Sequence, residues 1–258
     1  MTKRYLLTLK NSDYRSVQSR VSTLSSILGH MEVFYGIEGK ALSAAAYYKI
    51  MARAYAKHRQ IITPSEVGCA LSHLRMLEEF LKSQEQIALI FEDDVLIGER
   101  SIEMLQKSLE FVRPSDILVA CSQRGIEDPV RGLRLAEEIE CYEVQKEDWG
   151  VVKGTFAYAV GREAAEYVLS VQNDGLWPAD KFRILCPDKG RLLLCGAFDH
   201  PATRRSNLED ERRLKPEIPP RLLFFRLRAE LMKSIASKGN LLRGTIRSKF
   251  GGYRVIAK

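Results

Sequence analysis

The 258-residue sequence lacks several features that mark common protein classes. Its five cysteines form an odd set without a Cys-x-x-Cys pair, which argues against a disulfide framework or a zinc knuckle. No apolar run is long enough for a transmembrane helix, and the apolar stretch within the first nine residues is too short for a signal peptide. The glycines and prolines are scattered, without repeats or low-complexity tracts. These absences predict a globular protein of the reducing cytoplasm.

The formal net charge of +7 is concentrated at the C-terminal end. Residues 211–258 contain 13 Lys and Arg but only 3 acids, so the rest of the chain is mildly acidic. Leu, Phe and Ile alternate with these cations, as in a helix that lies on an anionic membrane. We therefore predict a folded domain over residues 1–210 and a basic amphipathic helical extension over 211–258. The alternatives are an extension that packs on the domain and one that forms a homodimer contact.

Apolar patterns along the first 195 residues predict alternating strands and helices. This order indicates an α/β fold with a mostly parallel central sheet, in which ligands bind beyond the carboxyl ends of the strands. Residues 123–140 are predicted to be a polar, variable stretch. The predicted strands are 5–9, 32–37, 87–91, 116–120, 155–160 and 191–195, and the predicted helices are 13–28, 41–58, 63–83, 102–111 and 162–171.

Three adjacent acids, Glu92, Asp93 and Asp94, follow the apolar strand predicted at 87–91. Carboxylates this close together repel one another, and burial increases the penalty. A divalent cation would offset the repulsion, and hard oxygen ligands suit Mn²⁺ or Mg²⁺. The alternative is a solvated turn whose acids cap the next helix.

A second group of polar side chains lies on the helix predicted to begin at Thr63. Glu66, Cys69 and His73 share one face at helical spacing, with Ser72 beside them. This stripe can bind a ligand. In the other interpretation, Glu66 closes a capping box on Thr63, while the cysteine and histidine pack in the core. A Cys/His metal site is not expected, because only two soft ligands are present here.

Several of these motifs together resemble glycosyltransferase family 25, the lipooligosaccharide glycosyltransferases. The resemblance spans roughly residues 5–207, and the E-V-G-C-A-L-S-H helix followed by a strand ending in E-D-D is its most specific part. The motifs are L-T-L-K-N-S at 7–12 with Arg15 and Arg20, residues 34–39, E-V-G-C-A-L-S-H at 66–73, L-I-F-E-D-D-V at 89–95, G-T-F-A-Y at 154–158, P-A-D at 178–180 and S-N at 206–207.

The resemblance implies a GT-A-like nucleotide-sugar fold and an inverting transfer from a UDP-sugar, usually UDP-galactose. It also implies a lipooligosaccharide or lipopolysaccharide acceptor, and hence a peripheral enzyme on the cytoplasmic face of the bacterial inner membrane. Asp94 would be the direct ligand of Mn²⁺ or Mg²⁺, with Glu92 as a further candidate ligand, and Asp93 or Glu92 would contact ribose or water. Asp180 would be the catalytic base, with Asp188 and Asp199 in reserve. The other residues assigned to donor binding are Asn11, Arg15, Glu66, Ser72, His73, Gly154, Thr155, Ser206 and Asn207.

Two other functions compete with this interpretation. A metal-dependent phosphotransferase could use the same acids, although the sequence has no P-loop pattern. A non-enzymatic adaptor could bind a membrane or nucleic acid through the basic end. Nucleic acid is not expected as a partner, because no strand interleaves aromatic and basic residues.

Overall fold

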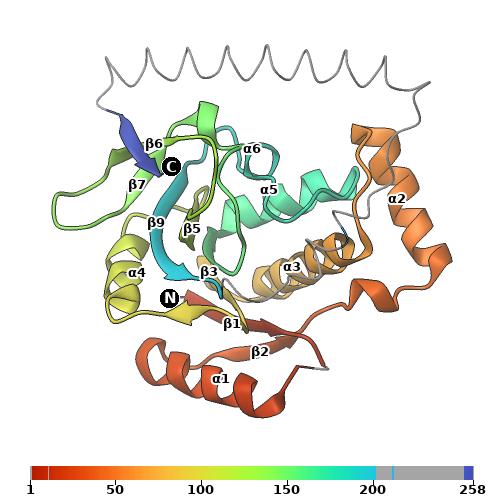
Figure 1. The fold of residues 1–258 in the computed structure, drawn as a ribbon, viewed down its shortest axis with the longest axis horizontal. Coiled ribbons are helices and arrows are strands. Elements are labelled where there is room, and N and C mark those ends of the chain that lie inside the picture. Colours follow the sequence, from red (N-terminus) through yellow and green to blue (C-terminus); the bar gives the residue numbers. More distant parts are fainter. Residues whose placement is uncertain (1, 11, 202–210, 212–252, 258) are drawn as a thin grey trace.

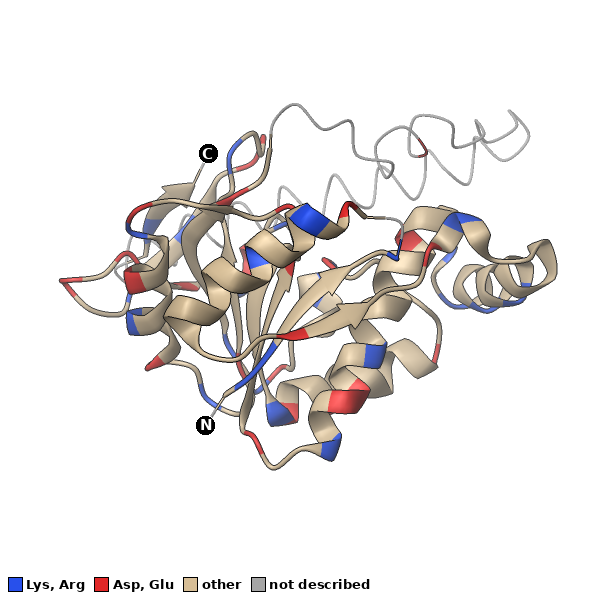
Figure 2. Ribbon diagram, turned by 90° about the horizontal axis from the view of Figure 1, so that it is seen from below, with Lys and Arg blue, Asp and Glu red and all other residues tan. Residues whose placement is uncertain are grey.

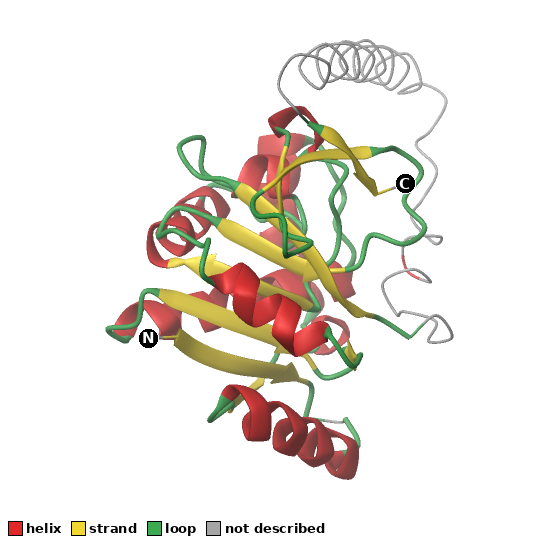
Figure 3. Cartoon of the chain, turned by 90° about the vertical axis from the view of Figure 1, so that its left-hand side faces the viewer, coloured by secondary structure: helices red, strands yellow, loops and turns green. Residues whose placement is uncertain are grey.

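A computed structural model of the chain describes residues 2–10, 12–201, 211 and 253–257. These residues form a ten-stranded sheet with helices on both faces (Figures 1 and 3). The strands are β1 (Thr2–Thr8), β2 (Glu32–Tyr35), β3 (Ile87–Glu92), β4 (Leu96–Ile97), β5 (Ile117–Cys121), β6 (Val130–Arg134), β7 (Tyr142–Val144), β8 (Ala157–Gly161), β9 (Leu192–Asp199) and β10 (Arg254–Ala257). The helices are α1 (Tyr14–Leu28), η1 (Gly39–Ala41), α2 (Ala44–His58), α3 (Pro64–Lys82), α4 (Ser101–Leu109), η2 (Lys146–Asp148), α5 (Arg162–Asn173) and α6 (Phe182–Leu185).

The sheet is mixed, which corrects the prediction of a mostly parallel one. Its order is β10-β6-β7-β9-β5-β8-β3-β1-β2, with β4 paired to β9 outside this path. β1 is parallel to β2 and β3, and β5 is parallel to β9, whereas every other pair is antiparallel. The main cause is β8, which enters between β3 and β5 and runs against both. Alternating strands and helices in a sequence do not reveal such an insertion.

Strand β6 lies within the stretch that the sequence analysis left as polar and variable. Its Arg131 is buried and forms a bidentate pair with buried Asp148, which also accepts a hydrogen bond from the Arg131 backbone N–H at 2.8 Å. A buried charged pair in a strand hides the apolar alternation by which strands are recognised. The partner lies 17 residues away, so no local pattern indicated that this charge would be neutralised.

The helices divide between the two faces of the sheet. α4 packs against β5 and β9, while α3 and α5 pack against each other on the opposite face (Figure 1). α2 extends away from the sheet and has cations but no acids (Figure 2). Two of them hold it to the end of α5: Arg53 donates to the Asn173 carbonyl at 3.2 Å, and Lys57 pairs with Asp174 at 3.0 Å. None of the helices described is long and apolar enough to cross a bilayer.

The start of α3 agrees with the prediction made from the sequence. Thr63 caps the helix, Pro64 occupies its first turn, and Glu66 completes the capping box by accepting from the Thr63 backbone N–H at 2.8 Å. The predicted capping box is therefore confirmed. It fixes the N-terminal end of the helix that carries Cys69 and His73.

Glycines bring the loop before η1 into direct contact with α3. A Cβ on Gly68 would lie 2.4 Å from the Gly39 nitrogen and 2.6 Å from the Ile37 carbonyl oxygen. Ser72, one turn further along, accepts a hydrogen bond from the Ile37 N–H at 2.7 Å and donates to the Gly68 carbonyl at 2.6 Å. Glycine is unfavourable inside a helix by about 1 kcal/mol, so close backbone packing is the reason for its place here.

Two short parts of the predicted basic extension are described, and both contact the domain. β10 pairs antiparallel with β6, so residues 254–257 form a strand rather than part of a helix. Glu211 accepts hydrogen bonds from the backbone N–H and the hydroxyl of Ser65 at 2.9 and 2.8 Å. Most of the predicted extension lies outside the described residues, and the division at residue 210 stays a prediction.

We expect Gly68→Ala to lower the free energy of unfolding by about 1–3 kcal/mol, the usual range for overpacking. The new methyl group would press on backbone atoms of the loop, which cannot move aside as a flexible side chain can. Urea denaturation followed by circular dichroism measures the change. Gly150→Ala is the matched control, since a Cβ there meets only the Arg183 side chain at 3.6 Å. Equal stability of Gly68→Ala and wild type would contradict the tight contact.

Candidate functional site

The candidate site lies at the carboxyl end of β3, where an entirely buried stretch of strand meets three carboxylates. The three side chains have partners from different parts of the chain. Glu92 accepts a hydrogen bond from the Thr155 hydroxyl at 2.9 Å, and its Oε1 lies 3.4 Å from Nε2 of His73. Because the three carboxylates contact partners in different parts of the chain, they repel one another less than the sequence predicted for adjacent acids.

Asp93 and Asp94 contact residues at the ends of other strands. The hydroxyl of Thr8, the last residue of β1, donates to Asp93 Oδ2 at 2.5 Å. Asp94 Oδ2 lies 2.8 Å from Nε2 of His200, which follows β9. The other oxygen of Asp94, Oδ1, is buried and has no hydrogen-bond partner among the described residues.

Burial and like charges raise the pKa of Asp94 above its ordinary value. Burial is the largest cause, and the negative charges of Glu92 and Asp93 add to it, while His200 acts in the opposite direction. Asp94 is thus held in a position that disfavours its ionised form. A bound cation would reverse this preference, and the unpartnered Oδ1 is a carboxylate oxygen of the kind that Mn²⁺ or Mg²⁺ binds.

Glu92 shows the opposite behaviour. Burial alone would raise its pKa, but the neighbouring His73 and the Thr155 hydroxyl outweigh burial and lower the pKa below the ordinary value. Glu92 is therefore stabilised as a carboxylate by groups on the α3 side. Since its Oε1 faces Thr155 and His73, and Oδ1 of Asp94 has no hydrogen-bond partner among the described residues, the geometry favours Asp94 over Glu92 as the ligand of a donor-site cation.

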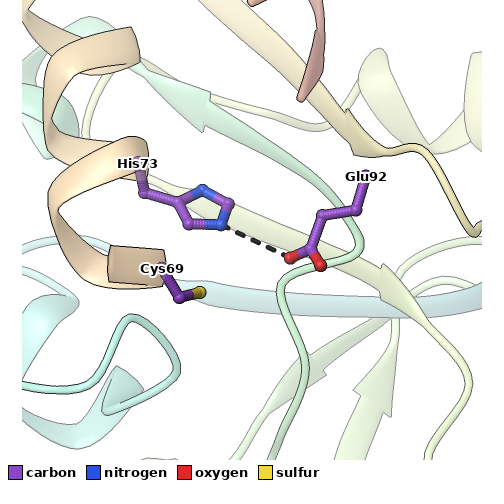
Figure 4. A group of neighbouring side chains, drawn as sticks. All are labelled: Cys69, His73 and Glu92. Carbon is purple, nitrogen blue, oxygen red and sulfur yellow. Dashed lines mark ion pairs between the residues drawn. The ribbon is translucent and has the colours of Figure 1, made fainter. Parts of the chain in front are cut away.

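His73 connects α3 to the strands of the sheet (Figure 4). Its ring Nδ1 lies 3.0 Å from the hydroxyl of Tyr158 on β8, and the side chain of Cys69, one turn earlier on α3, faces the same space as Glu92. Burial raises the pKa of Tyr158 well above its ordinary value, so the hydroxyl stays protonated. The helical spacing placed these α3 residues on one face but provided no reason to expect Glu92 opposite them.

A small cavity of about 30 Å³ borders this group. Its lining is mostly apolar, with His73, Thr155, Tyr158 and Gln172 as polar members. Ala179 and Phe182 also line it, which places the 178–180 segment beside the residues that contact Glu92. Asp180, the predicted base, lies between these two lining residues and is half-buried. Its catalytic role stays a prediction.

The remaining predicted residues differ in their surroundings. Glu66 and Ser72 are buried and engaged in the helix cap and the loop contact, so ligand binding by them stays a prediction. Gly154 has a left-handed backbone at φ +92° and packs on Cys121, just before Thr155. Arg15 is exposed in the first turn of α1. Asn11, Ser206 and Asn207 lie outside the described residues.

The two reserve acids differ in position. Asp188 is exposed, and its carbonyl oxygen accepts from Lys146 at 2.5 Å. Asp199 ends β9 next to His200, and its carboxylate lies 3.4 Å from Arg124. Of the two reserve acids, Asp199 is therefore the one next in sequence to His200, which contacts Asp94.

Two residues that contact the three acids directly were not assigned a role from the sequence: Thr8 and His200. Both stand at strand ends, where α/β proteins place ligand-binding groups, and this position was the available signal. The missing information was the strand order, because only the sheet brings β1 and β9 to the same end as β3.

Residues 1–182 match a family model described as glycosyltransferase family 25 (LPS biosynthesis protein). No curated protein matches the chain. Similar solved structures include mannose-1-phosphate geranyltransferase from Thermus thermophilus, with 14% identity, coverage of 78% of this chain and 75% of that one, and a TM-score of 0.42. A glycosyltransferase involved in glycosylation of the major capsid of PBCV-1 has 11% identity, coverage of 82% and 98%, and a TM-score of 0.39.

We expect Asp94→Asn to raise the melting temperature by a few degrees at neutral pH in EDTA. The folded-state pKa of Asp94 is raised, so its charged form opposes folding above that pKa, and the penalty disappears below the unfolded-state value of about 3.9. The advantage of the variant should therefore shrink as the pH falls. Differential scanning calorimetry across this range measures it. Asp199→Asn, at a more exposed acid, serves as control, and a variant no more stable than wild type at neutral pH would refute the expectation.

Proposed function

The chain belongs to glycosyltransferase family 25, and we propose that it transfers a sugar, with galactose as the first candidate, from a UDP-sugar to a lipopolysaccharide or lipooligosaccharide acceptor. The observation that carries the donor-site part of this proposal is the unpartnered, buried Oδ1 of Asp94 at the end of a central strand. The family match supports the reaction class and the type of acceptor.

The residues around the acids have distinct tasks in this proposal. Asp94 would hold a divalent cation through Oδ1, while His200 fixes the carboxylate through Oδ2 at 2.8 Å. Thr8 orients Asp93 toward ribose or a water ligand at the same strand end. When bound, the cation would neutralise the negative charge that develops on the departing nucleotide diphosphate.

The transfer also needs a group that takes a proton from the acceptor hydroxyl. In an inverting, single-displacement reaction this base acts as the new bond forms. We assign Asp180 to it, because the 178–180 segment borders the cavity lined by His73 and Thr155. The proton moves from the acceptor oxygen to the Asp180 carboxylate, and the sugar–phosphate bond breaks with its electrons passing to UDP.

The basic end of the chain fits an acceptor that is anchored in a membrane. Residues 211–258 hold 13 cations interspersed with Leu, Phe and Ile, the composition of a segment attracted to anionic lipid. We propose a peripheral position on the cytoplasmic face of the inner membrane, where lipid-linked acceptor saccharides would be within reach.

We expect wild-type protein with Mn²⁺ to release UDP from one member of a UDP-sugar panel. Asp94→Ala should lower this turnover at least about a hundredfold, because the transition-state charge loses its cation. Coupled UDP detection measures both, with Glu99→Ala as the control at an exposed acid nearby. Equal turnover by wild type and Asp94→Ala would reject the assignment. Release of inorganic phosphate from a phosphorylated substrate, without sugar transfer, would instead support the phosphotransferase alternative.

We expect the triple substitution Arg221→Gln, Arg226→Gln and Arg228→Gln to weaken sedimentation with anionic vesicles about a hundredfold, at about 1 kcal/mol for each cation. Vesicles with and without phosphatidylglycerol at low salt provide the measurement. Substituting Lys82, Lys107 and Lys189 by Gln removes the same charge from exposed positions of the domain and should have little effect. Equal losses in the two triple variants would show that net charge, and not the basic segment, attracts the protein to lipid.

A further inference from the structure

Three potential metal ligands of different chemistry meet between α3 and β3 (Figure 4). The thiol of Cys69, the imidazole of His73 and the carboxylate of Glu92 each offer an atom, and these atoms lie within 4.8 Å of one another. No other group of three or more His, Cys, Asp or Glu residues in the described part of the chain comes this close. We propose that Cys69, His73 and Glu92 bind one zinc ion, with a fourth coordination position left open.

The spacing between the nitrogen and the oxygen fits a shared ion. Nε2 of His73 and Oε1 of Glu92 are 3.4 Å apart, which is long for a hydrogen bond. Two ligands at about 2.0–2.1 Å from one tetrahedral zinc ion stand about 3.3 Å apart. The observed separation therefore needs almost no change on binding. The Cys69 sulfur lies within 4.8 Å of both atoms, and zinc–sulfur bonds are longer, at about 2.3 Å, so this sulfur is the third ligand of the set.

The histidine is prepared as a ligand. Its Nε2 is buried and makes no hydrogen bond among the described residues, although the side chain is only 6% exposed. The other ring nitrogen, Nδ1, lies 3.0 Å from the Tyr158 hydroxyl. Histidines that bind metal commonly donate from one nitrogen to such a partner, which leaves the lone pair of the other directed at the ion. Tyr158 is then a positioning residue for His73.

The charges and the ligand types select the ion. A thiolate and a carboxylate together neutralise the two positive charges of zinc, while the imidazole binds in its neutral form, so the site is electrically balanced within the fold. Binding releases the Cys69 thiol proton to solvent. Sulfur and nitrogen ligands suit zinc, whereas Mn²⁺ and Mg²⁺ prefer oxygen. The site therefore differs in selectivity from one built on Asp94.

The site has an entrance, because the Glu92 side chain is 28% exposed. An ion here would hold Glu92 on the α3 side and leave Asp93 and Asp94 for the nucleotide. It would also join α3 to the end of β3 beside the candidate donor site. The zinc proposal thus assigns Glu92 to zinc and not to the donor-site cation that the sequence analysis predicted for it. The proposal does not depend on the proposed function.

Metal titration of the purified full-length protein tests the proposal. After dialysis with a chelator and its removal, wild type in excess Mg²⁺, which occupies oxygen sites such as that of Asp94, should bind about one equivalent of Co²⁺ as a zinc substitute and show a thiolate-to-cobalt charge-transfer absorption. Added Zn²⁺ should abolish this band. Cys69→Ala should lose the band and the bound equivalent, whereas the matched variant Cys186→Ala, at a buried cysteine elsewhere, should keep both. Tyr158→Phe should keep the band but weaken zinc binding about 10–100-fold.

Circular dichroism of each variant separates loss of the site from loss of the fold. Asp94→Asn should retain the cobalt band, because Asp94 is not a ligand of the proposed zinc ion. The test of the zinc site therefore stands even if the protein fails to use UDP-sugars. A wild-type protein without a thiolate-to-cobalt band would overturn the proposal. So would equal zinc binding by wild type and folded Cys69→Ala, which would leave His73 and Glu92 as a simple polar contact.

Discussion

The site depends on how the fold accommodates three adjacent carboxylates at the end of a buried strand. Each acid contacts a different part of the chain: Glu92 contacts Thr155 and His73, Asp93 contacts Thr8, and Asp94 contacts His200. Hydrogen bonding and opposite charge lower the pKa of Glu92, whereas burial and like charges raise that of Asp94. Two neighbouring acids therefore have opposite preferences for protonation, set by their surroundings. The fold stabilises the negative charge of Asp94 least, so Asp94 would gain most from a bound cation.

Helix α3 links this site to the remainder of the domain. Its capping box fixes the helix start, and Gly68 allows the loop before η1 to lie against the helix backbone. Ser72 then binds that loop, and His73, the next residue, turns toward the sheet and meets Tyr158 and Glu92. The E-V-G-C-A-L-S-H motif thus combines packing residues with residues that face the acids. Its polar stripe is neither wholly structural nor wholly a binding surface.

The two proposed ions would have different chemistry and different effects. A hard cation on Asp94 would act on the nucleotide, while zinc on Cys69, His73 and Glu92 would fasten α3 to β3. The zinc site would include sulfur and nitrogen ligands, whereas the Asp94 site would offer carboxylate oxygens. Each site would therefore select a different kind of ion. The cavity bordered by Ala179 and Phe182 is also lined by His73, one of the three proposed zinc ligands.

The sequence by itself determined most elements, the capping box of Thr63 and Glu66, the strand that ends in Glu92 and membership of the family, because these depend on local patterns and short motifs. It did not determine the mixed sheet or strand β6, since the insertion of β8 and the pairing of Arg131 with Asp148 arise between distant segments. Only the tertiary structure brought Thr8 and His200 to the acids. It also supplied Glu92 as the third ligand beside Cys69 and His73, because helical spacing can align two side chains on α3 but cannot show which strand faces them.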